Sequence, residues 1–243
     1  RHVMLRSMKS ADLTIFISDF ARSFIEKIAV IPNAITIPHG IAESFKNSHH
    51  DLVRPEAVRR KPYLLYVSRF EIYKHHYQVV QAFSLLPKEM QLQYDLLLVG
   101  EHNFDEGHRV RRLVTELDIE TQVIFAGAVP YSDLPRYYQN AEAIIFASSC
   151  ENCPNIMLEG MAAGRPMLAS DIMPMPEFGG PAMEYFSPHK PSDIAEKLER
   201  VLSDSEYAKR LAVASKERSR LYDWDETASK TWKAIMNLAN DQE

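Results

Sequence analysis

The sequence predicts an α/β protein built on a doubly wound parallel sheet of Rossmann-like type. From residue 62 onwards, segments with strand character alternate with segments of helical character, which is the pattern of repeated βα units. The strand segments are continuous apolar runs such as DLLLVG (95–100), as expected for parallel strands covered on both faces. With 243 residues, of which 46% are hydrophobic, the chain is long enough to bury a core of this kind.

The residues before this repeat are predicted to be organised differently. The elements expected there are a short helix (1–12), a buried strand (13–18), a helix (19–27) and a stretch that ends at a proline and a glycine (34–40). Residues 41–61 are polar, charged and without hydrophobic periodicity, which favours a connection between two domains. The alternative is that residues 1–60 form the front of a single domain.

From residue 62 the predicted elements follow one another with short connections. They are strand 63–68, helix 77–86, strand 95–100, helix 109–117, strand 123–127, helix 133–139, strand 143–148, helix 154–163, strand 166–170 and helices 191–203, 205–220 and 225–240. Asp193, Ser205 and Asp225 are plausible N-caps of the last three helices. We divide the chain into a first part (1–45), a connection (46–61), a sheet domain (62–220) and a closing helical segment (221–243).

Composition excludes some classes of function. A net charge of −5 and an isoelectric point near 6.0 argue against a nucleic-acid-binding protein, which needs a basic face. There is no run of 18 apolar residues that would span a membrane. Two cysteines in a chain of this length suggest a reducing, cytoplasmic setting. The chain lacks an apolar signal segment and does not start with Met, so we expect it to be a piece of a longer protein.

Motifs for several other chemistries are absent or weak. No G-x-G-x-x-G, G-x-x-x-x-G-K-[ST] or G-x-S-x-G segment occurs, which argues against dinucleotide enzymes, P-loop enzymes and α/β-hydrolases. Cys150 and Cys153 form a C-x-x-C before a helix, where redox chemistry is the alternative to two ordinary thiols. Metal binding is the alternative for His49–Asp51, His75–His76 and Asp223–Asp225, which we interpret as loop residues and a helix cap. We predict no metal site.

Two cations follow the first strand of the sheet domain. Arg69 comes directly after this strand, and Lys74 lies a few residues further on, before the next helix. Ligands of open parallel sheets bind outside the carboxyl ends of the strands. At an effective dielectric constant of about 20, a unit charge near 4 Å contributes roughly 4 kcal/mol, so the two cations could stabilise a departing diphosphate. The alternative is an ordinary solvated basic loop.

Two carboxylates lie around the helix 154–163. This helix is apolar almost all the way round, so it is predicted to be buried. Glu159 lies in its middle, and a buried carboxylate is costly without a partner or a task. Glu151 precedes the helix on the same side as the strand ends. Both acids are therefore candidates for ligand binding.

The start of the same helix is a candidate anion site. We expect Pro154 at the first helical position, with Asn152 or Cys153 as the cap. The N–H groups of a first turn have no intrahelical partner, and the helix dipole makes this end positive. A nucleotide sugar would suit the whole arrangement, with phosphate on the amides and hydroxyls on the carboxylates.

Two further loops are expected to shape the site. Tyr131 could lie against a flat base, with Val129 and the neighbouring backbone reading its edge; the alternative is a surface aromatic residue beside Pro130. Residues 177–180 are interpreted as a glycine turn in the pocket wall.

With these residues in view, the chain resembles the retaining glycosyltransferases of the "glycosyl transferases group 1" family, which have the two-domain GT-B architecture. SRFEIYKHH (68–76) is similar to the family's G-R-x-x-x-x-K-G segment. DLLLVGE, VIFAGAVPYSDLPRYYQNAEAIIFASS and ENCPNIMLEGMAAGRPMLAS then follow in family order, over most of the chain. Glu151 and Glu159 match the family's Glu-x7-Glu pair, its most recognisable feature.

The resemblance implies a role for each matching residue. Arg69 and Lys74 would contact the donor diphosphate. Glu151 would hold hydroxyls of the donor sugar near the reacting carbon, and Glu159 would bind the ribose hydroxyls. We take the first three as catalytic. The donor-binding set is Glu159 with Ser68, Tyr131, Asn152, Asn155 and Ile156, where the amides near the last two would touch phosphate.

The resemblance also implies how the whole enzyme works. Family members act without a metal or cofactor and keep the anomeric configuration, and the departing phosphate is thought to help deprotonate the acceptor. The partners would be a UDP-, GDP- or ADP-linked sugar and a carbohydrate or lipid-linked acceptor, with a cytoplasmic site of action and a membrane surface reached through the acceptor domain. Residues 1–45 would be the remnant of that domain, 62–220 the donor domain, and 221–243 a helix packing back toward the first domain. We therefore expect this chain to bind donor but to transfer slowly.

Two departures from the family pattern and two other functions are kept open. Ser68 stands where glycine is usual, and His75 replaces the glycine after the lysine, so the backbone of this loop could differ. The alternative functions are a nucleotide-sugar epimerase of the same fold and a non-catalytic nucleotide-sugar-binding module.

Overall fold

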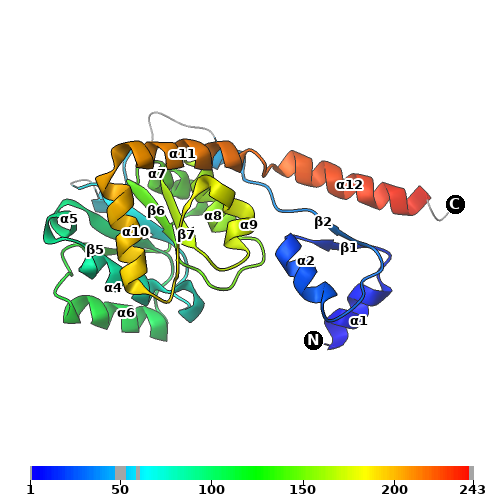
Figure 1. Ribbon diagram of the computed structural model, residues 1–243, viewed down its shortest axis with the longest axis horizontal. Helices are drawn as coiled ribbons and strands as arrows, with labels where there is room; N and C mark the ends of the chain where they lie inside the picture. Colours follow the sequence, from blue (N-terminus) through cyan, green and yellow to red (C-terminus); the bar gives the residue numbers. More distant parts are fainter. Residues whose placement is uncertain (1, 47–52, 59–60, 241–243) are drawn as a thin grey trace.

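The computed structural model describes residues 2–46, 53–58 and 61–240. It comprises a large sheet domain (residues 63–219), a small unit (residues 2–36) and a closing helix, α12 (Trp224–Asn240), which leaves the sheet domain and lies beside the small unit (Figure 1). None of the helices in the described ranges is both long and apolar enough to cross a membrane.

The sheet domain is built on six parallel strands in the order β5-β4-β3-β6-β7-β8. The strands are β3 (Tyr63–Val67), β4 (Asp95–Val99), β5 (Val123–Gly127), β6 (Ala143–Phe146), β7 (Met167–Ser170) and β8 (Glu184–Phe186). Every side chain of β3, β4, β6 and β7 is buried, as expected from their continuous apolar runs. Only the first residue of β5 is buried, because this strand lies at an edge of the sheet.

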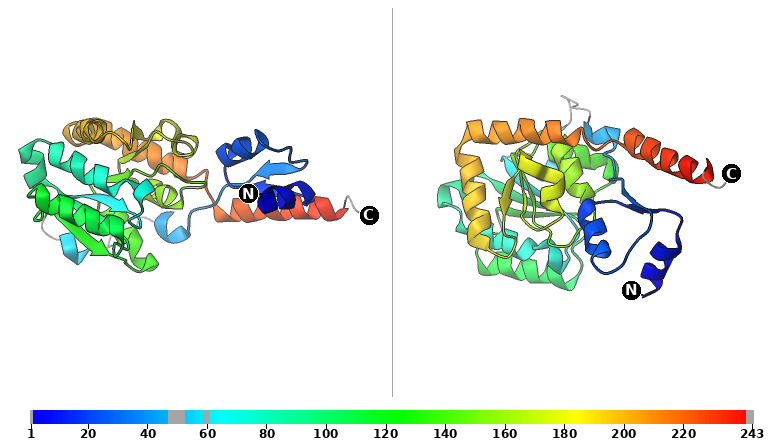
Figure 2. Two further views of the ribbon diagram at one scale, coloured as in Figure 1. Left: turned by 90° about the horizontal axis from the view of Figure 1, so that it is seen from below. Right: turned by 45° about the vertical axis from the view of Figure 1, so that its right-hand side comes forward.

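Helices cover both faces of this sheet, which confirms the doubly wound prediction (Figures 1 and 2). They are α4 (His76–Leu85), α5 (Lys88–Gln93), α6 (Asp105–Glu116), α7 (Leu134–Gln139), α8 (Asn155–Ala162), α9 (Met175–Gly179), α10 (Pro191–Ser203) and α11 (Ser205–Ser219). Helix α4 packs against α6 and α10, and α8 packs against α11. The chain crosses the sheet in one direction from β3 to β5 and in the other from β6 to β8, so right-handed connections place their helices on opposite faces.

The direction of the chain reverses between β3 and β6, which makes this the topological switch point of the sheet. The loops that follow these two strands leave the sheet side by side, and the Ser149 N–H donates to the Tyr73 carbonyl at 2.8 Å. Residues that are distant in sequence are thereby brought together at the carboxyl ends of the strands.

The small unit contains α1 (His2–Ser10), β1 (Thr14–Phe16), α2 (Asp19–Glu26) and β2 (Ala34–Thr36). Its two strands pair in parallel. The prediction of a buried strand over 13–18 is only partly correct, because Phe16 is the one buried residue of β1. Within the described residues this strand pairs only with β2, so much of its surface stays uncovered.

Some short elements were not predicted, and the helix caps differ from the expected ones. The elements missed are α5, α9, β8 and α3 (Glu43–Lys46). Helix α3 ends where the predicted connection (46–61) begins, and residues 47–52 and 59–60 of that connection lie outside the described residues. Asp204, not Ser205, caps α11 by accepting from the Tyr207 N–H at 2.9 Å. Asp223, not Asp225, accepts from the first N–H groups of α12. Asp193 instead accepts from the Ser187 N–H before α10 begins. The cap of α11 was predicted one residue too late, because Asp204, the residue before Ser205, has the extended backbone of a cap.

The chain passes between the sheet domain and the rest of the molecule twice, and the two passages lie side by side (Figure 2). The Ile41 N–H donates to the Tyr222 carbonyl at 3.2 Å, and Ile41 forms a parallel bridge with Asp223. A Cβ added to Gly40 would lie 2.2 Å from the Trp224 nitrogen, so this close contact requires glycine. The Lys46 ammonium pairs with Asp223 across the same joint. Both passages are therefore fixed to one another.

Candidate functional site

The loop after β3 is held tightly against the end of β4. The Ser68 N–H donates to the Val99 carbonyl at 2.8 Å, and the buried Ser68 hydroxyl donates to the carbonyl of Arg69. Gly100 has φ 147°, and a Cβ there would lie 1.9 Å from the Ser68 carbonyl oxygen. Gly100 thus allows the two strand ends to approach, which positions the loop that carries both predicted cations.

Lys74 and Glu151 meet at the switch point. The Lys74 ammonium forms an ion pair with the Glu151 carboxylate, and their side chains are only 10% and 15% exposed. Lys74 ends a short 3-10 turn, η2 (Ile72–Lys74), and its carbonyl accepts from the buried Tyr66 hydroxyl. The Phe146 ring lies 5.5 Å from the ammonium and covers it from the sheet side. The sequence predicted this convergence of one cation and one acid.

Arg69 points elsewhere. Its side chain is 59% exposed and lies near the carboxylates of Glu71 and Glu101, at 3.9 and 3.7 Å. Its guanidinium also lies over the Phe104 ring, 5.0 Å from the centroid. The structure therefore places Arg69 at the loop after β4 and not beside Glu151, because that loop supplies acidic and aromatic partners. Its assigned contact with a diphosphate stays a prediction.

Helix α8 starts at the same place. It begins at Asn155 rather than at Pro154, and no side chain caps it, so the prediction of Asn152 or Cys153 as cap is wrong. Pro154 has φ −82° and ψ 73°, the backbone of an inverse γ-turn, in which the Asn155 N–H turns back to the Cys153 carbonyl at 3.0 Å. The other N–H groups of the first turn have no intrahelical acceptor. They are available to an anion.

A pocket of about 260 Å³ lies between the ion pair and this helix start. It is lined by Lys74, Phe146, Glu151 and residues 153–156. A cation, a carboxylate and the positive end of a helix thus surround one small space. Asn155 and Ile156 line it, whereas Asn152 lines a different pocket. Their contacts with a donor stay predictions.

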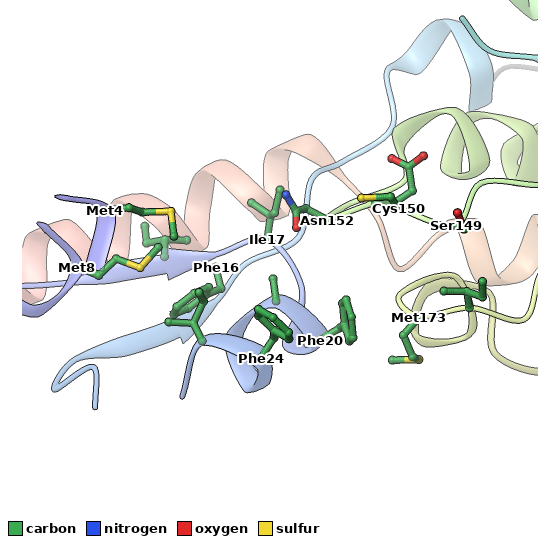
Figure 3. Close-up of a pocket in the computed structure, with 15 residues that line it drawn as sticks. Met4, Met8, Phe16, Ile17, Phe20, Phe24, Ser149, Cys150, Asn152 and Met173 are labelled. Atoms are coloured by element: carbon green, nitrogen blue, oxygen red, sulfur yellow. The ribbon is translucent and has the colours of Figure 1, made fainter. Parts of the chain in front are cut away.

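The second pocket is larger and mostly apolar. It has a volume of about 640 Å³ and lies between the small unit and the loops after β6 and β7 (Figure 3). Figure 3 shows Met4, Met8, Phe16, Phe20 and Phe24 on one side and Ser149, Cys150 and Met173 on the other, with Asn152 between them beside Ile17. Glu151 lines both pockets, so this residue lies at their boundary.

Glu159 is buried in the middle of α8, as its position in an apolar helix predicted. One of its oxygens accepts from the Tyr131 hydroxyl at 2.8 Å. Burial raises the pKa of Glu159 to about 7, and the Tyr131 hydrogen bond acts in the opposite direction. Tyr131 is 56% exposed, and its ring meets Phe45 edge-on at 5.2 Å. Whether this ring also contacts a base stays a prediction.

The residues considered for redox or metal chemistry include free thiols and a buried histidine packed between aromatic rings. Both cysteines are free, and burial raises the pKa of Cys153 to about 11, which keeps it a thiol. His76 is buried and stacked between Tyr66 and Phe70, and burial lowers its pKa to about 3. His49 and His50 lie outside the described residues. In the described part of the chain, no group of three or more His, Cys, Asp or Glu side chains could hold a metal ion.

One residue that contacts the start of α8 was missed, and one predicted loop has a different structure and role. His39, in the passage after β2, lies 3.1 Å from the Asn155 amide oxygen and stacks on Trp224. Residues 177–180 are not a simple glycine turn, because Glu177 is part of α9. Its carboxylate accepts from the N–H groups of Asp19 and Phe20 at the start of α2, both at 2.8 Å. No local sequence signal links segments so far apart.

Comparison with known proteins gives consistent results. The family model described as "Glycosyl transferases group 1" matches residues 51–218. O-antigen chain mannosyltransferase B of Escherichia coli is 25% identical over 243 residues, covering 96% of this chain and 62% of that protein. Serotype-specific mannosyltransferase WbdA of Escherichia coli is 26% identical over 232 residues, covering 92% of this chain and 28% of that protein. The chain therefore spans less than two thirds of these relatives.

Solved structures show the same fold. Anabaena HepE in complex with UDP and glucose superposes with a TM-score of 0.85 at 18% identity, covering 97% of this chain and 66% of that one. Sucrose-phosphate synthase of Thermosynechococcus elongatus gives a TM-score of 0.82 at 24% identity, covering 99% of this chain and 61% of that one. The likeness extends over the small unit and α12 as well as the sheet domain.

Proposed function

Because this chain belongs to the family of glycosyl transferases group 1, we propose that it is the donor-binding part of a glycosyltransferase that moves a sugar from a nucleoside diphosphate to an acceptor. The observation that carries the proposal is the small pocket in which Lys74, Glu151 and the start of α8 meet. A cation and uncapped helix amides suit a diphosphate, and a carboxylate suits the hydroxyls of a sugar.

The charges assign a chemical task to each group. Negative charge develops on the diphosphate as its bond to the sugar breaks, and the Lys74 ammonium would stabilise it there. Glu151 would hold sugar hydroxyls beside the reacting carbon. Its place at the boundary of the two pockets suits a sugar that passes from the donor in one pocket to an acceptor in the other. We propose that the configuration of the sugar is kept, with the departing phosphate accepting the proton of the acceptor hydroxyl.

The nucleoside end of the donor would bind further along α8. The buried Glu159 carboxylate can accept hydrogen bonds from two vicinal hydroxyls, as a ribose presents them. Such charge-assisted bonds contribute about 1.5–3 kcal/mol each. Arg69 would reach the diphosphate by leaving its exposed position beside Glu101.

The comparisons suggest which donor to test first. The two Escherichia coli relatives are named mannosyltransferases, so we propose a mannosyl group as the transferred sugar. HepE was solved with UDP, so UDP is the first nucleotide to test, and GDP is tested beside it. A carbohydrate or lipid-linked acceptor, a cytoplasmic site of action and contact with a membrane surface remain our predictions.

Calorimetry with UDP, GDP, ADP and their common sugars tests the donor assignment. We expect one nucleotide series to bind, and its affinity for the Lys74→Ala variant to be at least tenfold weaker, since an ion contact to phosphate is lost. The full-length protein, with its acceptor domain, is then incubated with that donor, with and without acceptor sugars, because the donor-binding part alone is expected to transfer slowly. Transfer supports the proposal, a change in the stereochemistry of the free donor indicates an epimerase, and binding alone indicates a non-catalytic module. If none of the nucleotides binds, the proposal is wrong.

A further inference from the structure

The contact between Tyr131 and Glu159 is not explained by donor binding alone. Glu159 is buried, and among the described residues the one hydrogen bond to its carboxylate comes from the Tyr131 hydroxyl, at 2.8 Å. Without that bond the carboxylate would be a buried charge with no partner, which is costly. The hydroxyl therefore both fixes the direction of the carboxylate and stabilises its charge.

Tyr131 is itself positioned by the segment that links the small unit to the sheet domain. It lies in a 3-10 turn, η3 (Tyr131–Asp133), after β5, and its ring packs edge-on against Phe45 at 5.2 Å. Phe45 belongs to α3 and is only 1% exposed. It also meets Tyr138 at 5.9 Å, and α3 packs against α8. Through Phe45, the linking segment thus packs between Tyr131 and α8, the helix that carries Glu159.

We propose that Tyr131 is a positioning residue for the donor, which holds Glu159 ionised and oriented for the ribose hydroxyls, and that Phe45 keeps Tyr131 in place. The inference rests on the proposed function, because it assumes that Glu159 meets the ribose. Tyr131 occupies one carboxylate oxygen and leaves the second oxygen, with the remaining lone pairs, for the ligand. The position of the linking segment would then control the affinity for the nucleotide.

The role of Tyr131 can be measured through the pKa of Glu159, because few charged groups lie around this carboxylate. Burial raises its pKa to about 7, and the Tyr131 hydrogen bond limits that rise. The other ionisable group that senses Glu159 is the buried Tyr138 hydroxyl of α7, whose pKa lies well above its ordinary value. Lys46 on α3 is paired with Glu43 and Asp223, and the Lys216 side chain of α11 lies over Gly164, beyond the far end of α8. In the described chain, the pKa of this carboxylate is set by its burial and by Tyr131, with no lysine or arginine acting on it.

The test is the pH dependence of nucleotide affinity in a Tyr131→Phe variant. The ring and its packing stay, and only the hydroxyl is removed. We measure Kd for GDP and for UDP by calorimetry between pH 5.5 and 9. Removal of a hydrogen bond to the charged form raises the pH at which affinity is lost by about one unit. We therefore expect binding about fivefold weaker at pH 7 and less than twofold weaker at pH 9.

Matched variants separate this role from a structural one. Tyr94→Phe removes a tyrosine hydroxyl just before β4, at the opposite end of the strand from the site, and should leave the pH profile unchanged. Phe45→Leu should move the profile in the same direction as Tyr131→Phe but less far. Its folding is checked by thermal unfolding, and a misfolded Phe45→Leu protein is replaced by Phe45→Met, which fills more of the space, lacks the ring and should move the profile in the same direction.

The outcomes distinguish this inference from the proposed function. If Glu159→Gln weakens nucleotide binding but Tyr131→Phe leaves the profile where it is, the role of Tyr131 is refuted and the ribose assignment stands. A shift with Tyr131→Phe and none with Phe45→Leu refutes the link to the connecting segment. If Glu159→Gln binds the nucleotide as the wild type does, or no nucleotide binds, the ribose assignment itself fails and this inference fails with it.

Discussion

Among the described residues, Lys74 is the one cation that lines the pocket between Glu151 and the start of α8, and replacing it by alanine removes that charge. Its side chain is 10% exposed, so its charge acts in a poorly hydrated place. At an effective dielectric constant of about 20, a unit charge near 4 Å contributes roughly 4 kcal/mol. Removing one preorganised donor from a developing negative charge typically costs about 2.7–4 kcal/mol. We therefore expect kcat/KM for sugar transfer to fall by about a hundredfold to a thousandfold.

The same substitution has a second effect that must be measured separately. It leaves the Glu151 carboxylate, 15% exposed, without its ion-pair partner. An unsatisfied polar group of this kind costs about 1–3 kcal/mol of stability, so the melting temperature should also fall. Steady-state transfer at saturating acceptor is compared with thermal unfolding for the wild type, Lys74→Ala and Lys74→Arg. Lys61→Ala is the matched control, because Lys61 pairs with Asp95 at the opposite end of the sheet and is 39% exposed.

The result decides between catalysis and packing. If kcat/KM of Lys74→Ala stays within threefold of the wild type while its melting temperature falls, Lys74 is a structural residue and the assignment to the leaving group is wrong. A rise in KM with unchanged kcat in Lys74→Ala would show that Lys74 stabilises the bound substrate and the transition state equally.

Three further predictions follow from other contacts. The pKa of Glu159 is raised from its ordinary 4.5 to about 7, so the stability linked to it is present below pH 4.5 and is lost as the pH rises through 7. Relative to Glu159→Gln, the free energy of unfolding of the wild type should fall by about 3 kcal/mol between pH 4.5 and 8.5, and an equal difference between the two proteins at both pH values would contradict this. Gly100→Ala places a Cβ 1.9 Å from a carbonyl oxygen, whereas Gly127, also at positive φ, has open space around its Cβ position; in urea unfolding Gly100→Ala should lose at least about 2 kcal/mol more than Gly127→Ala, and equal losses would show that the loop yields. Glu177→Gln removes the charge that caps α2, so the first two amides of that helix should exchange with deuterium about tenfold faster, and unchanged exchange would exclude this cap in solution.

The sheet domain could be predicted because its strands report their surroundings directly. The runs LLLV (96–99) and AIIF (143–146) are apolar at every position, which identifies parallel strands covered on both faces. Short elements such as α9 and β8 carry too few apolar positions to show a period, so they were missed. The cap of α11 was misplaced by one residue, because the backbone decides which of two adjacent polar residues is extended.

The site was predictable where one rule applies to distant segments. The carboxyl ends of parallel strands lie on one edge, so the sequence could place Lys74 near Glu151. The same rule does not say how a loop folds back. Arg69 therefore ended beside Glu101, and the partner of Glu159 proved to be Tyr131, which comes from the loop after another strand. Contacts between Glu177 and α2 depend on how the two parts of the molecule are arranged, which no local pattern records.

The joint at Gly40 brings both passages of the chain to one point. Because the Ile41 backbone is bonded to Tyr222 and Gly40 lies directly on Trp224, the small unit and α12 both leave the sheet domain from this joint. The hydrogen bonds from α2 to Glu177 form a second attachment of the small unit to the sheet domain. A change at either attachment would therefore alter the wall of the larger pocket, to which both α2 and Glu151 contribute.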